Sequence, residues 1–440
     1  MTTDDYYGAV RPPAARPTAV PGTDPGDPWE QESSVRSYSR NWPVVLRRGV
    51  GTTLYSADER AYLDFFAGAG ALNYGHNNPI LKSRLMAYLA GDGIIHSLDM
   101  WTEAKGEFLR AFRDLVLIPR GLDYKIQFTG PTGANAVEAA FKLARKVTGR
   151  RTVVAFTRSF HGVSLGALAA TGSASKRAAA GVNLPDVLRL PFDGFGSQEM
   201  SGPVLLADLL ADPSSGVDLP AAVVVETVQA EGGVNVAGAA WLRTLAQICQ
   251  QHGIMLIVDD IQVGCGRTGR FFSFEESGIR PDIVCLSKSL SGYGLPMAIL
   301  IYRRDLDVWE PGEHNGTFRG HNAAFVTATA AIQAYWSDGE FQRQCAAKSE
   351  LVAAALAALC DKYAGHGLAC RGRGLIWGLE FAAPGAARQV CDTAFQLCLL
   401  VEAAGPREEV VKLMPPLTAS DDELQQGLDL LGEAVREVLR

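Results

Sequence analysis

The sequence predicts an α/β protein with a mostly parallel central sheet, helices on both of its faces, and a second, smaller α+β domain. The first observation is that short apolar runs alternate with segments of helical periodicity between residues 101 and 336. The second is that Glu226, Asp259 and Lys288 stand at or near the ends of three such runs. Ligands of parallel sheets collect at the carboxyl ends of the strands, so these residues mark the expected site.

The alternation can be followed element by element. Residues 135–149 carry apolar side chains at helical spacing and predict a helix that stops at Gly149. Residues 221–228 form a β-branched run that is typical of a buried parallel strand. The elements expected next are a helix over 241–253, a strand over 254–260 and a strand over 281–288.

The length of 440 residues exceeds the usual size of one domain. We expect residues 87–344 to form a large domain, while residues 32–86 and 345–440 together form the smaller one. Residues 1–31 are acidic at their start and rich in proline and glycine, which predicts a disordered tail.

Composition excludes several classes of function. A net charge of -7 and the lack of a Lys/Arg-rich run argue against nucleic acid as a partner. No apolar run approaches the roughly 20 residues of a membrane-spanning helix, and no signal-peptide pattern is present, so we expect a cytoplasmic protein. The eight cysteines lack metal-ligand spacing and are expected to be buried thiols, with no bound metal.

Gly264, Gly266 and Gly269 reproduce the G-x-G-x-x-G spacing of dinucleotide-binding loops. In such loops the glycines follow a strand directly and open a helix, whereas here polar residues precede them and a short aromatic segment follows. We therefore interpret the motif as a glycine-rich turn. A nicotinamide-dependent dehydrogenase remains the rival interpretation from another enzyme class.

Two adjacent carboxylates, Asp259 and Asp260, end the strand expected over 254–260 and must point to opposite faces. Asp259 then shares a face with Ile261. Such a pair suits a protonated heteroaromatic ring, which needs an anion at its nitrogen and apolar packing on its face. We interpret Asp260 as structural, in an ion pair with Arg267.

Lys288 ends an apolar run, and the small residues that follow it permit close approach of the backbone. A lysine withdrawn from water favours its neutral amine, which attacks aldehydes to form Schiff bases. In residues 128–145 a Gly/Thr-rich turn leads into a helix, whose free N–H groups favour an anion at Gly133 and Ala134. Together these features indicate pyridoxal phosphate, with its phosphate at that helix, its ring nitrogen at Asp259 and its aldehyde at Lys288.

These residues together resemble the class III aminotransferases, which are pyridoxal-phosphate enzymes of the aspartate-aminotransferase fold (fold type I). The resemblance extends from about Glu32 to the C-terminus. The acid-x-x-Gln motif of the family appears at residues 259–262, its aromatic-His-Gly motif at residues 160–162, and its E-x-x-Q-x-E-G-G segment at residues 226–233.

The resemblance implies roles for particular residues. It places Asp259 at the pyridine nitrogen and Gln262 near the ring hydroxyl, with Ile261 and Phe160 on the two ring faces. His161 is expected to be structural, because Lys288 already serves as the base.

It also matches Glu226 and Glu231 to paired glutamates of the family. Thr317 corresponds to a threonine that reaches the phosphate from the partner subunit, so the resemblance implies a homodimer or a higher homo-oligomer with shared active sites.

Longer strings, among them FFAGAGALNYGHNNP and WEPGEHNGTFRG, are similar to one subgroup, the diaminobutyrate-2-oxoglutarate aminotransferases of ectoine synthesis. The implied reaction moves an amino group from L-glutamate to L-aspartate 4-semialdehyde by a ping-pong mechanism. The alternatives are another ω-amino substrate, such as ornithine or 4-aminobutyrate, and a non-catalytic binding protein on the same scaffold. The latter would not need both Asp259 and Lys288.

Lys412 stands where many ω-aminotransferases place an arginine that grips the substrate carboxylate, and lysine lacks the planar fork of arginine. Lys412 and Glu231 are the candidate substrate-binding residues, with a solvated surface charge as the alternative for Lys412. Tyr38 and Arg40 are further candidates from their position alone.

Overall fold

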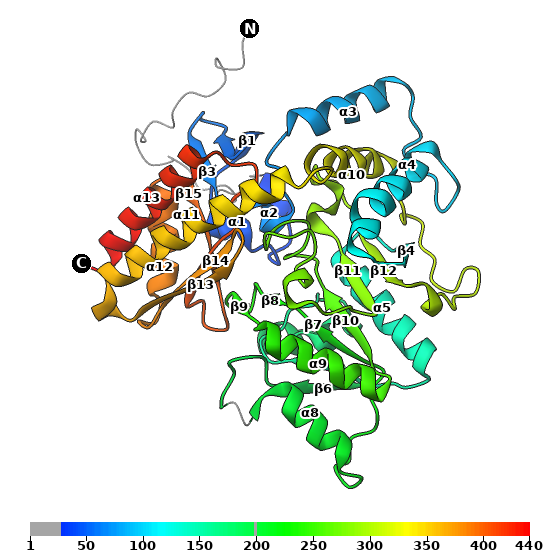
Figure 1. The fold of residues 1–440 in the computed structure, drawn as a ribbon. Coiled ribbons are helices and arrows are strands. Elements are labelled where there is room, and N and C mark those ends of the chain that lie inside the picture. Colours follow the sequence, from blue (N-terminus) through cyan, green and yellow to red (C-terminus); the bar gives the residue numbers. More distant parts are fainter. Residues whose placement is uncertain (1–27, 198–199) are drawn as a thin grey trace.

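The central sheet confirms the predicted α/β class. The structure is a computed structural model that describes residues 28–197 and 200–440 (Figure 1). Seven strands follow the order β4-β12-β11-β10-β7-β5-β6, and β12 alone among them runs antiparallel to its neighbours. The strands are β4 (Tyr124–Phe128), β5 (Val153–Phe156), β6 (Val187–Leu190), β7 (Ala222–Val225), β10 (Met255–Asp259), β11 (Ile283–Leu286) and β12 (Ile299–Arg303).

Helices cover both faces of this sheet, as the alternation predicts. Successive residues of a strand point to opposite faces, so Val223 belongs to the core cluster that includes Leu245, while Val224 belongs to a second cluster that includes Phe141. The helices of this large unit are α4 (Glu103–Phe112), α5 (Gly133–Thr148), α6 (Leu165–Ala170), α7 (Ala174–Ala178), α8 (Gly202–Ala211), α9 (Ala239–His252) and α10 (Asn322–Tyr335).

Two predicted helix ends are confirmed. Gly149 follows α5 with φ 68° and Gly253 follows α9 with φ 59°, a left-handed conformation that costs glycine little. The strand expected over residues 221–228 is interrupted, because β7 ends before Glu226 and pairing resumes in the short hairpin of β8 (Val228–Gln229) and β9 (Asn235–Val236). The interruption leaves the Glu226 side chain at the carboxyl end of the sheet.

Segments from both ends of the chain build a second unit, seen on the left of Figure 1. Its two sheets have the orders β1-β2-β3-β15 and β13-β14-β17-β16, and β15 pairs in parallel with β3. The strands are β1 (Leu46–Val50), β2 (Thr53–Ser56), β3 (Ala61–Asp64), β13 (Leu368–Arg373), β14 (Ile376–Phe381), β15 (Leu399–Leu400), β16 (Glu402–Ala404) and β17 (Val410–Leu413).

We propose that this composite unit is the smaller domain expected from the sequence. The expected boundaries at residues 86 and 344 fall inside helices α3 and α11. The α-helices outside those of the large unit are α1 (Tyr38–Asn41), α2 (Ala67–Gly70), α3 (Pro79–Ala90), α11 (Glu340–Lys362), α12 (Ala386–Gln396) and α13 (Asp421–Val438).

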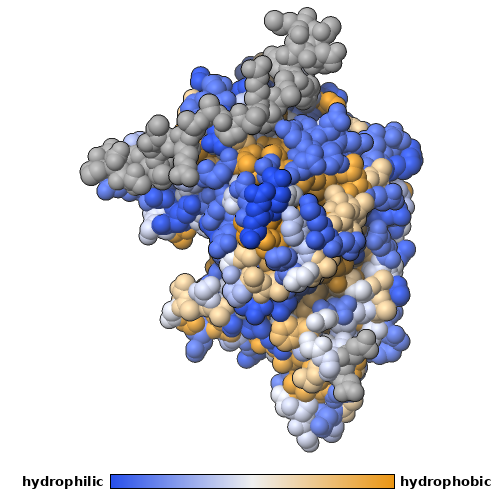
Figure 2. All heavy atoms as spheres, turned by 90° about the vertical axis from the view of Figure 1, so that its left-hand side faces the viewer, coloured by the Kyte–Doolittle hydropathy of each residue, from blue (hydrophilic) through white to orange (hydrophobic). Residues whose placement is uncertain are grey.

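The outer surface is of mixed polarity. Figure 2 shows hydrophilic residues over much of the face that lies on the left of Figure 1, with apolar residues gathered between them. None of the helices within residues 28–197 and 200–440 combines the length and the apolar character that crossing a membrane would require. Most of the tail expected over residues 1–31 lies outside the described residues, and the exposed segment Pro28–Gln31 forms a short 3-10 helix.

Candidate active site

Lys288 lies two residues beyond the end of β11, at the start of a short 3-10 helix, Lys288–Ser291. Its backbone adopts φ 51°, an uncommon conformation for a residue with a side chain. The flanking serines anchor it, because Ser287 Oγ donates to Met297 O at 2.8 Å and Ser289 Oγ donates to Gly70 O at 2.7 Å. These bonds tie the lysine both to its own sheet and to the smaller unit.

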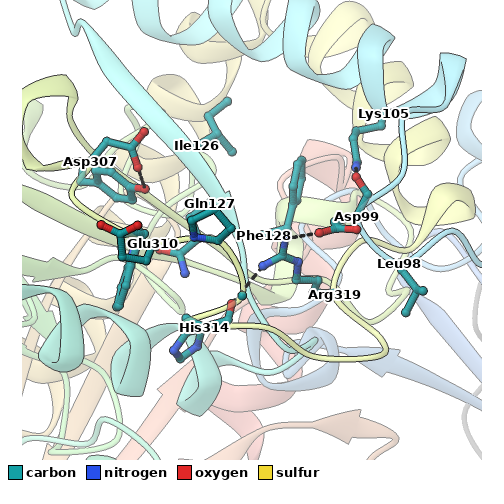
Figure 3. Close-up of a pocket in the computed structure, with 14 residues that line it drawn as sticks. Leu98, Asp99, Lys105, Ile126, Gln127, Phe128, Asp307, Glu310, His314 and Arg319 are labelled. Carbon is teal, nitrogen blue, oxygen red and sulfur yellow. Dashed lines mark hydrogen bonds and ion pairs between the residues drawn. The ribbon is translucent and has the colours of Figure 1, made fainter.

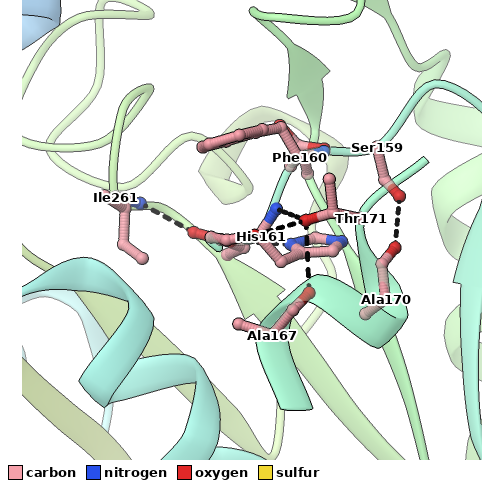
Figure 4. A network of polar contacts seen from close by, with 10 residues as sticks. Ser159, Phe160, His161, Ala167, Ala170, Thr171 and Ile261 are labelled. Carbon is pink, nitrogen blue, oxygen red and sulfur yellow. Dashed lines mark hydrogen bonds and ion pairs between the residues drawn. The ribbon is translucent and has the colours of Figure 1, made fainter. Parts of the chain in front are cut away.

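Asp259 is the last residue of β10 and is 5 % exposed. Its Oδ2 atom lies 2.7 Å from Nδ1 of His161, and its Oδ1 accepts a hydrogen bond of 3.2 Å from the backbone N–H of Ile261. Figure 4 shows the His161 side of this network, in which Thr171 Oγ1 accepts a hydrogen bond of 3.0 Å from the backbone N–H of His161. The carboxylate is therefore held on two sides.

Asp260 points away from Asp259, but its expected ion pair with Arg267 is wrong. The Asp260 carboxylate accepts from the backbone N–H of Ser273 at 3.1 Å, and burial raises its pKa to about 7. The reason is the intervening turn, which directs the Arg267 guanidinium toward the smaller unit. Arg267 donates to Leu375 O, Pro415 O and Asn73 Oδ1.

The G-x-G-x-x-G segment is a turn, as the sequence indicates. Gly266 and Gly269 have φ values of 93° and 97°, and the N–H of Gly264 donates to Asp260 O at 2.9 Å. A side chain at Gly266 would approach Trp336 to 2.6 Å. The glycines thus serve close packing of the chain, and they open no α-helix, since turns lead from them to the short 3-10 helix Glu275–Ser277.

One pocket brings most of the sequence-predicted residues together. It has a volume of about 160 Å³ and is lined by Gly133, Ala134, Phe160, His161, Gly162, Glu226, Val228, Asp259, Ile261, Gln262, Val263 and Lys288. The N-terminus of α5 opens into it at Gly133. A Cβ at that position would lie 3.0 Å from Ile261 Cδ1, so glycine lets the helix approach the opposite wall.

Glu226 contributes to the pocket through Phe160. Its Oε2 accepts a hydrogen bond of 3.0 Å from the backbone N–H of Phe160, which fixes the loop that carries the aromatic ring. Burial, and then the nearby charge of Asp259, raise the pKa of Glu226 well above its usual value. Glu226 can accept the hydrogen bond from the Phe160 N–H even when its carboxyl group is neutral, because its oxygen keeps a lone pair.

A cluster of three charged side chains lies beside the pocket. Lys412 is 1 % exposed, so the alternative of a solvated surface charge is wrong. Its Nζ lies 2.6 Å from Glu231 Oε1 and 3.0 Å from Glu402 Oε2. Burial opposes the charge of Lys412, but Glu231 and Glu402 more than compensate and raise its pKa above the usual value. We call Glu231, Glu402 and Lys412 the distal cluster.

Gln262 connects the distal cluster to the pocket. It lines the pocket, and its Nε2 donates to Glu231 Oε1 at 3.1 Å. Tyr38 also lies beside the cluster, since burial and the charges of Glu402 and Glu231 raise its pKa to about 12. The structure does not bring Arg40 there, because its guanidinium donates to the backbone carbonyls of Arg36 and Ser34.

Thr317 does not line the pocket of Lys288. It is exposed, and its carbonyl accepts from Nε2 of His96 at 2.7 Å. The same loop borders a separate pocket of about 350 Å³, in which Arg319 pairs with Asp99 at 3.0 Å (Figure 3). The contact of Thr317 with a partner's cofactor stays a prediction.

Sequence reasoning missed two features of this site. Glu402 was not singled out, although a lone acid in the apolar run 399–404 was a usable signal. The contact between His161 and Asp259 was also missed, since residues 98 positions apart carry no local signal of pairing.

A partly buried lysine, an aspartate and a helix N-terminus at the carboxyl edge of an α/β sheet define a class of protein, the pyridoxal-phosphate enzymes of fold type I. The sequence pattern of the class III aminotransferases matches residues 34–435, and the chain belongs to that family. It is therefore a PLP-dependent aminotransferase.

Individual proteins are similar over nearly the whole chain. A diaminobutyrate-2-oxoglutarate transaminase of Nocardia farcinica is 58% identical over 92% of this chain and 93% of its own. A Vibrio cholerae transaminase of the same name is 54% identical over 92% of this chain and 98% of its own. The crystal structure of ornithine aminotransferase from Toxoplasma gondii superposes with a TM-score of 0.80 at 25% identity, covering 93% of both chains.

The residues of the pocket fit pyridoxal phosphate. Asp259 supplies a fixed anion, Ile261 and Phe160 supply apolar walls, and the N-terminus of α5 supplies free N–H groups behind a glycine that a Cβ would crowd. Lys288 supplies an amine, since burial and then Lys412 lower its pKa to about 8 against the opposing charge of Glu231.

A pH dependence follows from Lys288. Only the neutral amine attacks an aldehyde, and a pKa near 8 means that its fraction rises as the pH rises through 8. We expect the rate at which cofactor-free enzyme attaches pyridoxal phosphate to rise with a midpoint near pH 8, as followed by visible absorbance in stopped flow. A midpoint near the ordinary lysine value of about 10.4 would contradict this expectation.

Proposed function

We propose that this chain transfers the amino group of L-glutamate to L-aspartate 4-semialdehyde, giving 2-oxoglutarate and L-2,4-diaminobutyrate. The proposal is supported by relatives of that name at 52% to 58% identity. The observation that carries it is the pairing of Lys412 with Glu231 beside the pocket of Lys288. A substrate with a reacting group at one end and both a carboxylate and an ammonium at the other finds a complementary charge for each.

The residues of the pocket would divide the work as follows. Backbone N–H groups at Gly133 and Ala134 bind the phosphate, while Asp259, oriented by His161, pairs with the ring nitrogen. Phe160 and Ile261 pack on the two ring faces. Gln262 lies near the ring hydroxyl, and Glu226 keeps Phe160 in place.

The cofactor, when bound, supplies an electron sink for the substrate carbon. Lys288 is the group that moves the proton from that carbon, because it is the amine in the pocket and its lowered pKa suits proton transfer near neutral pH. The walls around it restrict water. The same residues act in both half-reactions, first on glutamate and then on the semialdehyde, which is the ping-pong sequence.

We propose a homodimer as the minimum assembly, in which Thr317 reaches the site of the neighbouring subunit from its exposed loop. We also propose that the enzyme acts in the cytoplasm and that its product enters ectoine synthesis.

The test is a single-turnover half-reaction. Purified enzyme carrying its cofactor is mixed separately with L-glutamate, L-2,4-diaminobutyrate, L-ornithine or 4-aminobutyrate, and the loss of its visible band is followed. We expect glutamate and diaminobutyrate to bleach the band, with 2-oxoglutarate and aspartate semialdehyde as the products. Faster bleaching by ornithine or 4-aminobutyrate would reassign the substrate within the family.

A further inference from the structure

The distal cluster contains two carboxylates and one ammonium, all largely removed from water. Lys412 is fully buried, the side chain of Glu402 is 10% exposed and that of Glu231 is 29% exposed. Buried charges are tolerated when they are paired, and one lysine can balance only one of the two carboxylates. With both carboxylates ionised, the cluster carries one excess negative charge; burial raises the pKa of Glu402, and the charge of Lys412 opposes that rise.

The two carboxylates are held in different ways. Glu402 lies opposite Lys412 in the pairing of β16 with β17, so the strand ladder fixes its place. Its Oε2 lies 3.0 Å from Nζ without being aligned for a hydrogen bond, which makes the contact mainly electrostatic. Glu231 follows β8 in the turn before β9, and its carboxylate accepts from both Lys412 and Gln262.

This arrangement assigns the excess charge to the side that faces the substrate. Glu402 lies opposite Lys412 on the neighbouring strand and adds a negative charge 3.0 Å from Nζ, while Lys412 donates its hydrogen bond to Glu231 at 2.6 Å. Glu231, which is the more exposed of the two carboxylates and is bonded to the pocket residue Gln262, keeps negative charge that Lys412 alone does not cancel. An ammonium group at the far end of a substrate would meet this charge.

We propose that Glu402 is a specificity-determining positioning residue, which acts through Lys412 to favour substrates with an ammonium group at their distal end. The inference rests on the proposed function, because diaminobutyrate and aspartate semialdehyde carry an α-ammonium beside the α-carboxylate when their other end reacts. Glutamate, which reacts through its α-amino group, presents only a carboxylate there. Glu402 thus favours the half-reaction of diaminobutyrate and aspartate semialdehyde over that of glutamate.

The test is the variant Glu402→Gln, which keeps the shape of the side chain and removes the charge. Single-turnover titrations would give a dissociation constant and a maximal rate for each substrate. We expect the dissociation constant for diaminobutyrate to rise about tenfold, the size of a lost interaction with a charged group. The constant for glutamate should stay the same or fall, because its distal carboxylate loses a repulsive charge, and the maximal rates should stay the same.

A matched substrate isolates the contribution of the α-ammonium group to binding. 4-Aminobutyrate has the same reacting amine and carbon chain as diaminobutyrate but lacks the α-ammonium, so its constant, measured as substrate or as competitor, should follow that of glutamate. Equal losses for all three compounds, or no loss for diaminobutyrate, would overturn the role of Glu402. Such equal losses are the result that a merely structural role predicts.

Two further variants complete the design. Glu408→Gln removes one carboxylate from the exposed turn of the same hairpin and should leave every constant unchanged. Glu402→Asp retains the charge and should recover most of the affinity for diaminobutyrate. If Glu402→Gln unfolds at a lower temperature, the ratio of its constants for diaminobutyrate and glutamate still tests the inference, because a general loss of structure would weaken both substrates alike.

The wild-type data separate the two claims. If wild type reacts with ornithine in place of diaminobutyrate, the proposed substrate is wrong, but ornithine also carries a distal α-ammonium and tests Glu402 equally well. If wild type reacts with diaminobutyrate while the variant shows equal losses throughout, the substrate stands and the role of Glu402 falls. A wild type that accepts neither diamine overturns both claims.

Discussion

Replacing Lys288 with alanine is expected to lower transamination by roughly 10⁴-fold or more. General acid-base catalysis by one side chain accounts for about 10² to 10⁴ in rate, and Lys288 also supplies the amine that attaches the cofactor. The measurement is the steady-state rate, together with peptide mapping after borohydride reduction of the holoenzyme. We expect the reduced cofactor on Lys288 in the wild type and on no residue in the variant.

The variant should stay folded, because the flanking serines carry the hydrogen bonds of this segment. Lys412, the fully buried amine beside the pocket, is the informative alternative, since it is held by two carboxylates and strongly favours its charged form. Cofactor reduced onto Lys412 or any other lysine would refute the assignment of Lys288. Thermal unfolding of the variant is the control for a general loss of structure.

Replacing Asp259 with asparagine is expected to lower the maximal rate by roughly 10² to 10³-fold, the range found when one preorganised electrostatic contact is lost. Asparagine fills the same space and can still bond to His161, but it no longer provides the anion that keeps the ring nitrogen protonated. Rapid-reaction kinetics of the glutamate half-reaction would measure the loss. Substrate affinity should change much less than the rate.

Asp260 offers a matched control for this experiment. It is the adjacent residue and carries the same side chain, but it faces Ser273 on the other side of the strand. Asp260→Asn should retain the visible spectrum and most of the rate, and any cost should appear in thermal stability. An unimpaired Asp259→Asn variant, or equal losses in the two variants, would disprove the special role of Asp259.

The fold was predictable where the signal is local. Gly149 and Gly253 end helices because each adopts a backbone conformation that other residues avoid, and the sequence shows such positions directly. The ends of β10 and β11 were predictable for a similar reason, since apolar runs stop there and polar residues begin. Asp259 and Lys288 could be selected before any geometry was known because they lie at or just beyond these ends.

The side-chain partners in the candidate site were less predictable, because they depend on contacts between residues that the order of the sequence does not reveal. The expected pair of Asp260 with Arg267 failed because the glycine turn between them reverses the direction of the chain. The partnership of Glu402 with Lys412 depends on the register of a hairpin, and the Gly-Pro pair at residues 405–406 marks the turn without fixing which residues pair across it. Both are consequences of backbone direction and register, not of residue type.

The pairing of β15 with β3 has a consequence for the order in which the molecule is assembled. These strands lie more than 300 positions apart, so their sheet closes only after nearly the whole chain has left the ribosome. Lys288 and Asp259 belong to elements that emerge earlier, whereas Glu402 and Lys412 arrive with the last strands. During synthesis the residues proposed to bind the cofactor precede those proposed to select the substrate, and a chain cut short after α11 would contain the first set without the strands that carry Glu402 and Lys412.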